Sequence, residues 1–201
     1  MQVNTSEQRA SLRKQIRQRR RALSEQDQAL AASQLLEHFT SSDAIIKASR
    51  IALYLSVDGE LDTAPLIARC WAQGKDVYLP VIHPFSKGHL LFLHYHPKTQ
   101  LVPNQYGILE PKLDVRDVLP AAKLDVICTP LVAFDAAGQR LGMGGGYYDR
   151  TLAPWYETGA GAKPIGLAHD CQQLDALPVE VWDVPLPEIM TPSRHWTWSI
   201  K

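Results

Sequence analysis

The sequence predicts an α/β domain built on a mainly parallel β-sheet, and three observations support this class. Short apolar runs rich in strand-forming residues alternate along the chain with amphipathic helical patterns, the order expected of a parallel sheet covered by helices. The chain has 201 residues, 21 basic and 21 acidic side chains, and 45% hydrophobic residues, which is typical of a folded globular protein. No internal repeat, low-complexity linker or shift in composition divides it. We therefore expect residues 1–201 to form a single three-layer domain.

Two helices are predicted at the N-terminal end. Leu12 and Ile16 are four residues apart among basic residues, which is a helical spacing. Ser24 followed by Asp27 forms the pattern of a capping box, so a second helix is expected to begin there. One side of this second helix is expected to carry Ala29, Ala32, Leu36 and Phe39.

The remainder of the chain alternates between strands and helices. Residues 50–56 form a short apolar run that predicts a buried strand, and residues 61–75 predict a helix that ends at Gly74. Two strands joined by a turn-rich segment predict a small hairpin insertion near residues 80 to 100, the main irregularity of the domain. Further strands are expected within residues 123–134, 164–170, 185–193 and 195–200.

The cysteines and the apolar runs limit the class of protein. Cys70, Cys128 and Cys171 are odd in number and far apart, without the spacing of a zinc site. A reducing cytoplasm is the simplest location for such a chain. The first residues are polar and then basic, so no secretory signal is visible, and no run approaches ~18 apolar residues. We expect a cytoplasmic protein that does not contact a membrane.

A basic segment runs from Arg9 to Arg21, with seven lysines and arginines and no acidic residue. Such a helix can bind nucleic acid phosphates, reach over the domain to a bound nucleotide, or be a solvated surface helix. It lacks the interleaved aromatic residues that stack on bases, and the formal net charge of the chain is zero. These two features weigh against nucleic acid but leave the other two interpretations equal.

The segment GQRLGMGGGYYDR, residues 138–150, contains the most unusual pattern. Four of the five residues from Gly142 to Gly146 are glycine, interrupted by Met143, whereas a hairpin turn needs one or two glycines. Clustered glycines let backbone N–H groups approach an anion, and the residues that follow can open a helix whose N-terminus favours phosphate. The pattern predicts a phosphate-binding loop. It matches neither the P-loop nor the dinucleotide-binding fingerprint.

The residues beside the glycines have two interpretations each. Asp149 can hold Mg²⁺ together with phosphate oxygens, or it can be an acidic residue in the first turn of a helix. Arg140 and Arg150 can neutralise phosphate charge or be solvated ends of the loop. Tyr147 and Tyr148 can stack on a flat ligand or donate hydrogen bonds, although aromatic packing in the core is the commoner fate of one of them.

A second polar segment, SVDGELDT (residues 56–63), follows the first predicted strand. Ligands of open α/β sheets bind beyond the carboxyl ends of strands. Asp58, Glu60 and Asp62 suit a ligand with amino groups. The alternative, which the spacing favours, is a polar loop whose last acidic residue caps the next helix.

The glycine segment closely resembles the signature of the 5-formyltetrahydrofolate cyclo-ligase family, also called methenyltetrahydrofolate synthetase. The resemblance covers nearly the whole chain, because further segments occur in the order of the family. These are RRRALS, LSVDGELDT, YGILEP, CTPLVAFD, GLAHDCQ and WDVPL.

The resemblance implies a NagB/RpiA-like α/β fold and a reaction that uses ATP and Mg²⁺. The substrate would be 5-formyltetrahydrofolate, cyclised to 5,10-methenyltetrahydrofolate with release of ADP and phosphate after the formyl oxygen is phosphorylated. We expect the protein to act as a monomer without a nucleic acid partner.

The resemblance also implies site residues. For ATP they are Arg9, Arg13, Lys14, Arg140, Leu141, Gly142, Met143, Gly144, Gly145, Gly146, Tyr147 and Tyr148. The catalytic residues would be Arg140, Tyr148 and Arg150. The folate substrate would contact Val57, Glu60, Asp62, Tyr106 and the segment from Met143 to Tyr147. The magnesium carboxylates would be Asp149 and Asp183.

The sequence departs from the family at Gly145, where many members carry a lysine. A positive charge near the γ-phosphate must then come from elsewhere, with Arg140, Arg150 and the basic helix as candidates. This departure leaves open an ATP- or phosphosugar-using enzyme of the same fold with another acceptor, since a fold does not fix a function. A nucleic-acid-binding module based on the basic helix is the second alternative.

Overall fold

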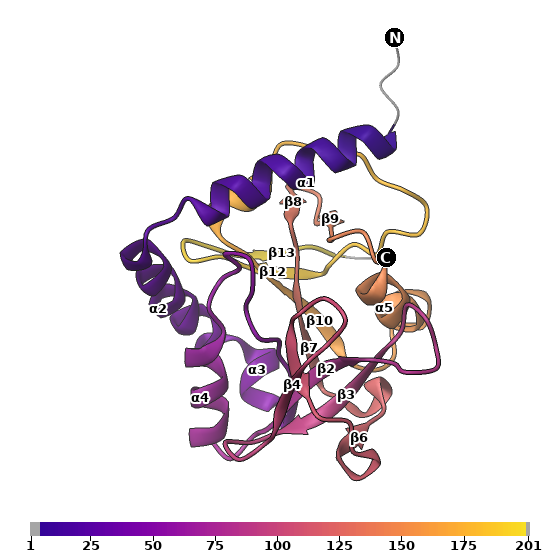
Figure 1. The fold of residues 1–201 in the computed structure, drawn as a ribbon. Coiled ribbons are helices and arrows are strands. Elements are labelled where there is room, and N and C mark those ends of the chain that lie inside the picture. The colour runs from indigo at the N-terminus through magenta and orange to yellow at the C-terminus, as the bar shows by residue number, and fades with distance from the viewer. Residues whose placement is uncertain (1–4, 200–201) are drawn as a thin grey trace.

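A computed structural model describes residues 5–199 of the chain (Figure 1). An eight-stranded sheet runs through them in the order β13-β12-β10-β7-β1-β2-β3-β6. The five strands from β12 to β2 pair in parallel, whereas β13, β3 and β6 pair antiparallel at the two edges. The predicted α/β class with a mainly parallel sheet is therefore confirmed. The strands of this sheet are β1 (Arg50–Ala52), β2 (Asp76–Ile82), β3 (Leu90–Tyr95), β6 (Val118–Leu119), β7 (Val126–Pro130), β10 (Lys163–Leu167), β12 (Glu188–Met190) and β13 (His195–Thr197).

Helices cover both faces of this sheet. Figure 1 shows α2, α3 and α4 on one side and α5 on the other, with α1 running across the end where β8 and β9 lie. Successive strand residues alternate between two cores, because Ile51 packs with α2 and α4 while Ala52 packs with Leu152 of α5. The helices are α1 (Thr5–Arg21), α2 (Glu25–Ser41), α3 (Asp43–Lys47), α4 (Ala64–Ala72) and α5 (Tyr147–Thr158), with 3₁₀ turns at Val115–Asp117, Ala121–Lys123 and Asp170–Gln172.

The capping box predicted for the second helix is present, since Ser24 Oγ accepts a hydrogen bond from the Asp27 N–H at 3.1 Å. The predicted apolar side of α2 is correct at Ala32 and Phe39 and wrong at the other two positions. Ala29 is exposed and Leu36 is only half-buried. The residues that α2 buries are Ala31, Ala32, Leu35 and Phe39.

The predicted hairpin insertion near residues 80 to 100 is wrong in its placement. The β2–β3 hairpin belongs to the main sheet, because its register runs from Val77↔Tyr95 to Ile82↔Leu90 and its side chains enter the core. The separate hairpin follows it and consists of β4 (Leu101–Pro103) and β5 (Leu109–Pro111). A further small sheet combines β8 (Ala133–Asp135), β9 (Arg140–Leu141) and β11 (Gln173–Leu174).

No helix within residues 5–199 is long and apolar enough to cross a membrane.

Candidate functional site

A cavity of about 740 Å³ lies beyond the carboxyl ends of the parallel strands, the position expected for ligands of open α/β sheets. Its wall is built from segments that are distant in sequence. They are the loop after β1 with Tyr54–Glu60, the end of β2, the turn between β4 and β5, the glycine segment, and Arg17 and Arg20 of α1.

The glycine segment turns sharply before α5. Gly144 has φ +104° and Gly146 has φ +66°, a region that side chains other than glycine rarely adopt. Gly146 is the N-cap of α5, and within the described chain no side chain caps this helix. Its first backbone N–H groups are therefore available to an anion, which the helix dipole also favours.

Two arginines hold the glycine segment from either side. Arg13 Nε of α1 donates to the Gly142 carbonyl at 2.8 Å, and Arg150 Nη1 donates to the Gly145 carbonyl at 2.8 Å. A Cβ added to Gly145 would lie 2.7 Å from the Tyr147 ring, so a lysine at this position would displace that ring. The positive charge at this loop comes from arginines of its own helix and of α1.

Each of the two predicted magnesium carboxylates is paired with an arginine. Arg140 Nη2 donates to Asp149 Oδ1, which also accepts a hydrogen bond from the Val184 N–H at 3.3 Å. Asp183 accepts two hydrogen bonds from Arg9, from Nη1 to Oδ2 at 2.5 Å and from Nη2 to Oδ1 at 2.9 Å. Because Asp149 contacts the residue next to Asp183, the two carboxylates lie on adjoining segments.

This donor set fits Mg²⁺ that is shared with phosphate. Carboxylate oxygens are hard ligands, and Mg²⁺ usually takes one or two of them with phosphate oxygens and waters. Among residues 5–199 there is no group of three or more His, Cys, Asp or Glu that could hold a metal, so the protein alone does not form a cage. In addition, Arg140 is buried, and its Nε has no hydrogen-bond partner in the described part of the chain. An anion beside it would satisfy this donor.

On the opposite wall, Glu60 is a buried carboxyl group. Its Oε2 accepts a hydrogen bond from the Val57 N–H at 3.2 Å, and Arg20 Nη2 lies 3.6 Å from its Oε1. Burial raises the pKa of Glu60 to about 7, although the positive charge of Arg20 opposes this shift. The Val57 N–H and the Glu60 carboxyl group thus form a polar patch in this wall.

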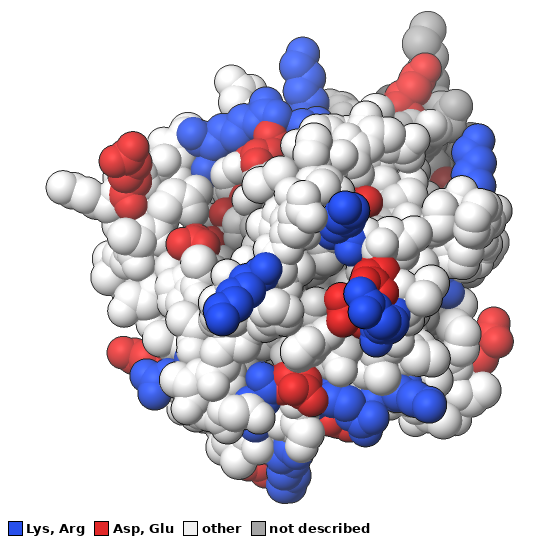
Figure 2. All heavy atoms as spheres, turned by 60° about the horizontal axis from the view of Figure 1, so that its bottom comes forward, with Lys and Arg blue, Asp and Glu red and all other residues white. Residues whose placement is uncertain are grey.

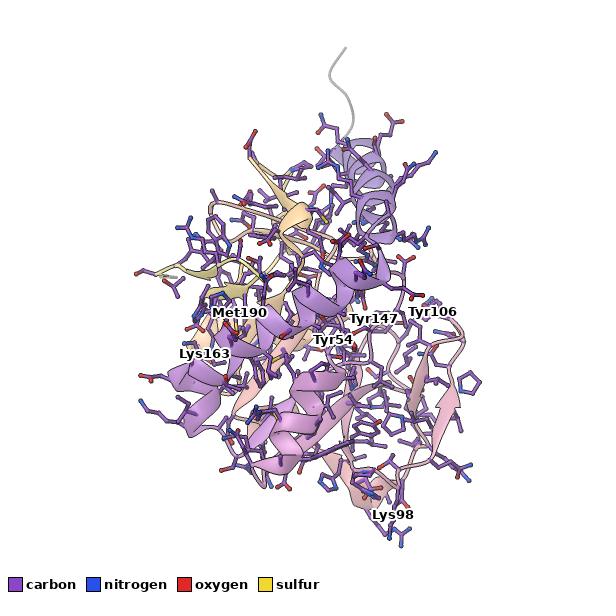
Figure 3. The ribbon with its side chains drawn as sticks, turned by 90° about the vertical axis from the view of Figure 1, so that its left-hand side faces the viewer. Tyr54, Lys98, Tyr106, Tyr147, Lys163 and Met190 are labelled. Carbon is purple, nitrogen blue, oxygen red and sulfur yellow. The ribbon has the colours of Figure 1, made fainter. Side chains whose placement is uncertain are left out.

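Two tyrosines meet at the edge of the cavity. Tyr106, in the turn between β4 and β5, has its hydroxyl 3.2 Å from that of Tyr147, the first residue of α5. Figure 3 shows Tyr54, Tyr147 and Tyr106 in one band across the molecule. The hydrogen bond with Tyr106 raises the pKa of Tyr147. Burial, and then the Glu60 carboxylate, raises that of Tyr148.

Some predicted site residues are not brought to the cavity. Asp62 is exposed, and its Oδ1 accepts a hydrogen bond at 2.9 Å from the N–H of Ala64, the first residue of α4, which agrees with the polar-loop alternative that the spacing favoured. Lys14 is exposed, and Leu141 is fully buried in a small core with Ile16. Arg9 and Asp183 bind each other outside the residues that line the cavity. The other predicted residues line the cavity, or contact or adjoin residues that do.

Sequence reasoning gave no site role to Arg20 of α1 and left Arg17 only as an alternative ATP-contacting residue of the basic helix. Both lie in the cavity wall and donate to Asp58. Asp58 was considered for an external ligand with amino groups, and it instead binds guanidinium groups of the same chain. The sequence signal that was available is the Asp58–Gly59 pair, a common turn dipeptide. It indicates the turn in which Asp58 adopts a φ of +56°.

The chain was compared with known proteins. The model of the 5-formyltetrahydrofolate cyclo-ligase family matches residues 5–192. The 5-formyltetrahydrofolate cyclo-ligase of Escherichia coli K12 is 57% identical over 185 residues, covering 91% of this chain and all of that protein. The Haemophilus influenzae protein of the same name is 50% identical over 188 residues, 94% of this chain and 99% of the relative. The solution structure of Aquifex aeolicus 5,10-methenyltetrahydrofolate synthetase superposes with a TM-score of 0.80 at 28% identity, covering 94% of this chain and 92% of that one.

Proposed function

The chain belongs to the 5-formyltetrahydrofolate cyclo-ligase family, and we propose that the cavity described above is where it converts 5-formyltetrahydrofolate into 5,10-methenyltetrahydrofolate with ATP. One observation carries this assignment of the site. The glycine segment, which suits phosphates, and the Val57–Glu60 segment, which suits a polar ring system, face one continuous cavity.

The proposed reaction has two steps. The formyl oxygen of the substrate attacks the γ-phosphorus of ATP, and ADP leaves. N10 of the folate then attacks the activated formyl carbon, the N10 proton is released, and the C–O bond breaks as inorganic phosphate departs. An amide oxygen is a poor leaving group, so phosphorylation is what allows the ring to close. The protein contributes chiefly positioning and stabilisation of phosphoryl charge.

The phosphates of ATP are proposed to lie against the glycine segment and the N-terminus of α5. Arg13 and Arg150, which already contact carbonyls of this segment, supply the charge that a lysine at position 145 would provide. Arg140 lines the same region, and its Nε has no hydrogen-bond partner among residues 5–199. Guanidinium groups suit this role because they bind phosphate oxygens through two parallel hydrogen bonds.

Asp149 and Asp183 are the residues proposed to hold Mg²⁺. When bound, the ion would neutralise charge on the phosphate oxygens. Arg140 and Arg9 fix the orientation of these two carboxylates, and they would share them with the ion.

The folate ring is proposed to lie on the apolar wall, with Glu60 accepting hydrogen bonds from its N–H groups. Tyr106 and Tyr147 contact each other at the edge of the cavity, where they would cover the ring. We do not assign Asp62 a direct contact, since its carboxylate binds the N–H group of Ala64 at the start of α4.

The competing functions have less support. Several arginines of the basic helix donate to Asp58 and Asp183 within the protein, which leaves them unavailable to nucleic acid. The face seen in Figure 2, which is turned away from α1, has basic and acidic side chains interspersed and therefore lacks the mainly basic surface expected of a nucleic acid site. A different acceptor on the same fold has less support, because the family model that matches residues 5–192 is that of the cyclo-ligase.

The test is photometric. The purified protein is incubated with 5-formyltetrahydrofolate, ATP and Mg²⁺, and the near-ultraviolet absorbance of the methenyl product is followed, with ATP or Mg²⁺ omitted as controls. Growth of the band that needs both is expected. A folded protein that binds ATP but forms no product would mean that the cavity serves another acceptor.

The proposal includes four further expectations. We propose a single domain over residues 1–201 with a NagB/RpiA-like fold, and action as a monomer. We also propose a cytoplasmic location, which is consistent with three free cysteines, Cys70, Cys128 and Cys171.

A further inference from the structure

Helix α1 connects the two halves of the cavity. Near its N-terminus, Arg9 donates to Asp183 and Arg13 donates to the Gly142 carbonyl, both on the proposed phosphate side. Its C-terminal half contacts the loop after β1, on the proposed folate side. Arg9 and Arg21 are twelve residues apart, which corresponds to about 18 Å of helix. The helix is long enough to bridge both ligands.

A single carboxylate accepts hydrogen bonds from three arginines in the C-terminal half of α1. Asp58 Oδ2 accepts from Arg17 Nε at 2.6 Å and from Arg20 Nη2 at 2.9 Å, and Asp58 Oδ1 accepts from Arg21. The Asp58 carbonyl also accepts from Arg20 Nε at 2.8 Å. The side chain of Arg20 is fully buried, so this arrangement is part of the interior.

The backbone at Asp58 is held in an unusual conformation. Its φ of +56° is the only positive value for a residue other than glycine within the described chain. Such a conformation persists when the surrounding contacts determine it, and here they are the three arginines of α1.

The same contacts reach Glu60. Arg20 Nη2 lies 2.9 Å from Asp58 Oδ2 and 3.6 Å from Glu60 Oε1. A ligand that hydrogen-bonds Glu60 therefore changes the surroundings of a guanidinium group that anchors α1. A ligand on the glycine segment acts on the other end of the same helix through Arg13.

We propose that Asp58 is a positioning residue that anchors α1 between the two half-sites, and that α1 thereby couples the binding of ATP to the binding of the folate substrate. This inference rests on the proposed function of the cavity. Each ligand adds contacts at one end of the helix, so the second ligand binds to a helix whose position the first ligand has already restricted further. The coupling must be reciprocal: each substrate tightens the other by the same factor.

The test measures the dissociation constant of a non-hydrolysable ATP analogue with and without saturating 5-formyltetrahydrofolate, and the reverse pair. In the unchanged protein we expect each ligand to tighten the other by about fivefold or more. Asn at position 58 tolerates the positive φ but carries no charge. Asp58→Asn should therefore bring the coupling ratio, the dissociation constant without the second ligand divided by that with it, close to one. Arg21→Gln removes one contact to Asp58 from outside the cavity and should reduce the ratio partially.

Asp114→Asn is the matched control, because Asp114 also accepts several hydrogen bonds from an arginine, Arg116, but on an exposed turn outside the cavity. It should leave both constants and the coupling unchanged. Thermal unfolding shows whether Asp58→Asn folds. If it does not, the coupling measured in Arg21→Gln tests the inference instead. A ratio of one in the unchanged protein, or full coupling in folded Asp58→Asn and Arg21→Gln, would overturn the inference. Failure of the unchanged protein to bind either substrate would instead overturn the proposed function.

Discussion

Arg140 donates a hydrogen bond to Asp149 across the glycine segment, and the pair is nearly excluded from solvent, with 2% and 16% of the two side chains exposed. The arginine is thus held beside the proposed phosphate site by the same carboxylate that is proposed to bind Mg²⁺. Removing the carboxylate would leave a buried guanidinium group without its partner, which typically costs several kcal/mol.

Asp149→Asn separates the catalytic from the structural role of this residue. The amide oxygen can still accept a hydrogen bond from Arg140, so the fold is expected to persist. We expect kcat and kcat/KM to fall together by about 100-fold, with a higher Mg²⁺ requirement, because charge stabilisation of the transferred phosphate is lost. Steady-state kinetics across a Mg²⁺ titration measures both effects. Unchanged kcat and Mg²⁺ dependence would remove Asp149 from the metal site.

Gly144→Ala is expected to raise the KM for ATP while leaving the KM for folate nearly unchanged. At φ +104° an alanine is strained, and its Cβ would lie 3.5 Å from the Arg13 guanidinium carbon. Gly161→Ala is the matched control, since Gly161 has φ +100° with its nearest neighbour, Ala122 Cα, 3.9 Å from the added Cβ. Similar destabilisation in both variants, with the change in KM confined to Gly144→Ala, is the predicted result. Equal KM values for ATP in the two variants would contradict a phosphate site here.

Glu60 should make the folded protein less stable as the pH rises. Burial raises its pKa from 4.5 to about 7, so between these values the folded state holds a proton that the unfolded state has released. The free energy of unfolding therefore falls through this window, by about 3 kcal/mol in all. Glu60→Gln should abolish this contribution.

Denaturant unfolding between pH 4 and 8 tests this prediction. The quantity to compare is the free energy of unfolding of Glu60→Gln minus that of the unchanged protein at each pH. The difference is needed because buried His169, whose pKa is lowered by burial, contributes the opposite slope below about 6.5. If this difference in free energy does not grow between pH 4.5 and about 7, Glu60 is not protonated in the folded state over that range.

Tyr54→Phe is expected to stabilise the protein without ligands. The Tyr54 hydroxyl is buried and has no hydrogen-bond partner among residues 5–199, and an unsatisfied hydroxyl costs about 1–3 kcal/mol. Its removal should raise the melting temperature by about 2–4 °C or more. Tyr78→Phe, on the neighbouring strand and outside the cavity, should have little effect. A loss of stability in Tyr54→Phe would show that the hydroxyl has a partner, such as an ordered water.

Local signals predicted much of the fold. The capping box at Ser24 and Asp27 and the alternation of strands with helices depend on neighbouring residues, so a single sequence contains them. The β4–β5 hairpin was misplaced because its strands have three residues each, too few to show an alternating pattern. The displaced apolar side of α2 reflects tertiary packing that helical periodicity does not specify.

The sequence could predict the glycine loop of the candidate site but not the pairings of its residues. The glycines and their following helix are adjacent in sequence, so the loop could be predicted from local chemistry. The bond from Arg13 to Gly142 spans 129 residues and that from Arg9 to Asp183 spans 174, and only the tertiary fold brings these together. For the same reason the role of Asp58 as an anchor for α1 was not visible beforehand.

The transfer of the formyl oxygen to phosphate tests the central claim most directly. 5-Formyltetrahydrofolate labelled with ¹⁸O in its formyl group is converted with unlabelled ATP in ordinary water, and the released inorganic phosphate is analysed by mass spectrometry. If both substrates react within the one cavity as proposed, each phosphate released during turnover carries one ¹⁸O atom. Methenyl product accompanied by unlabelled phosphate would contradict the account, because the formyl oxygen would then have left without being phosphorylated.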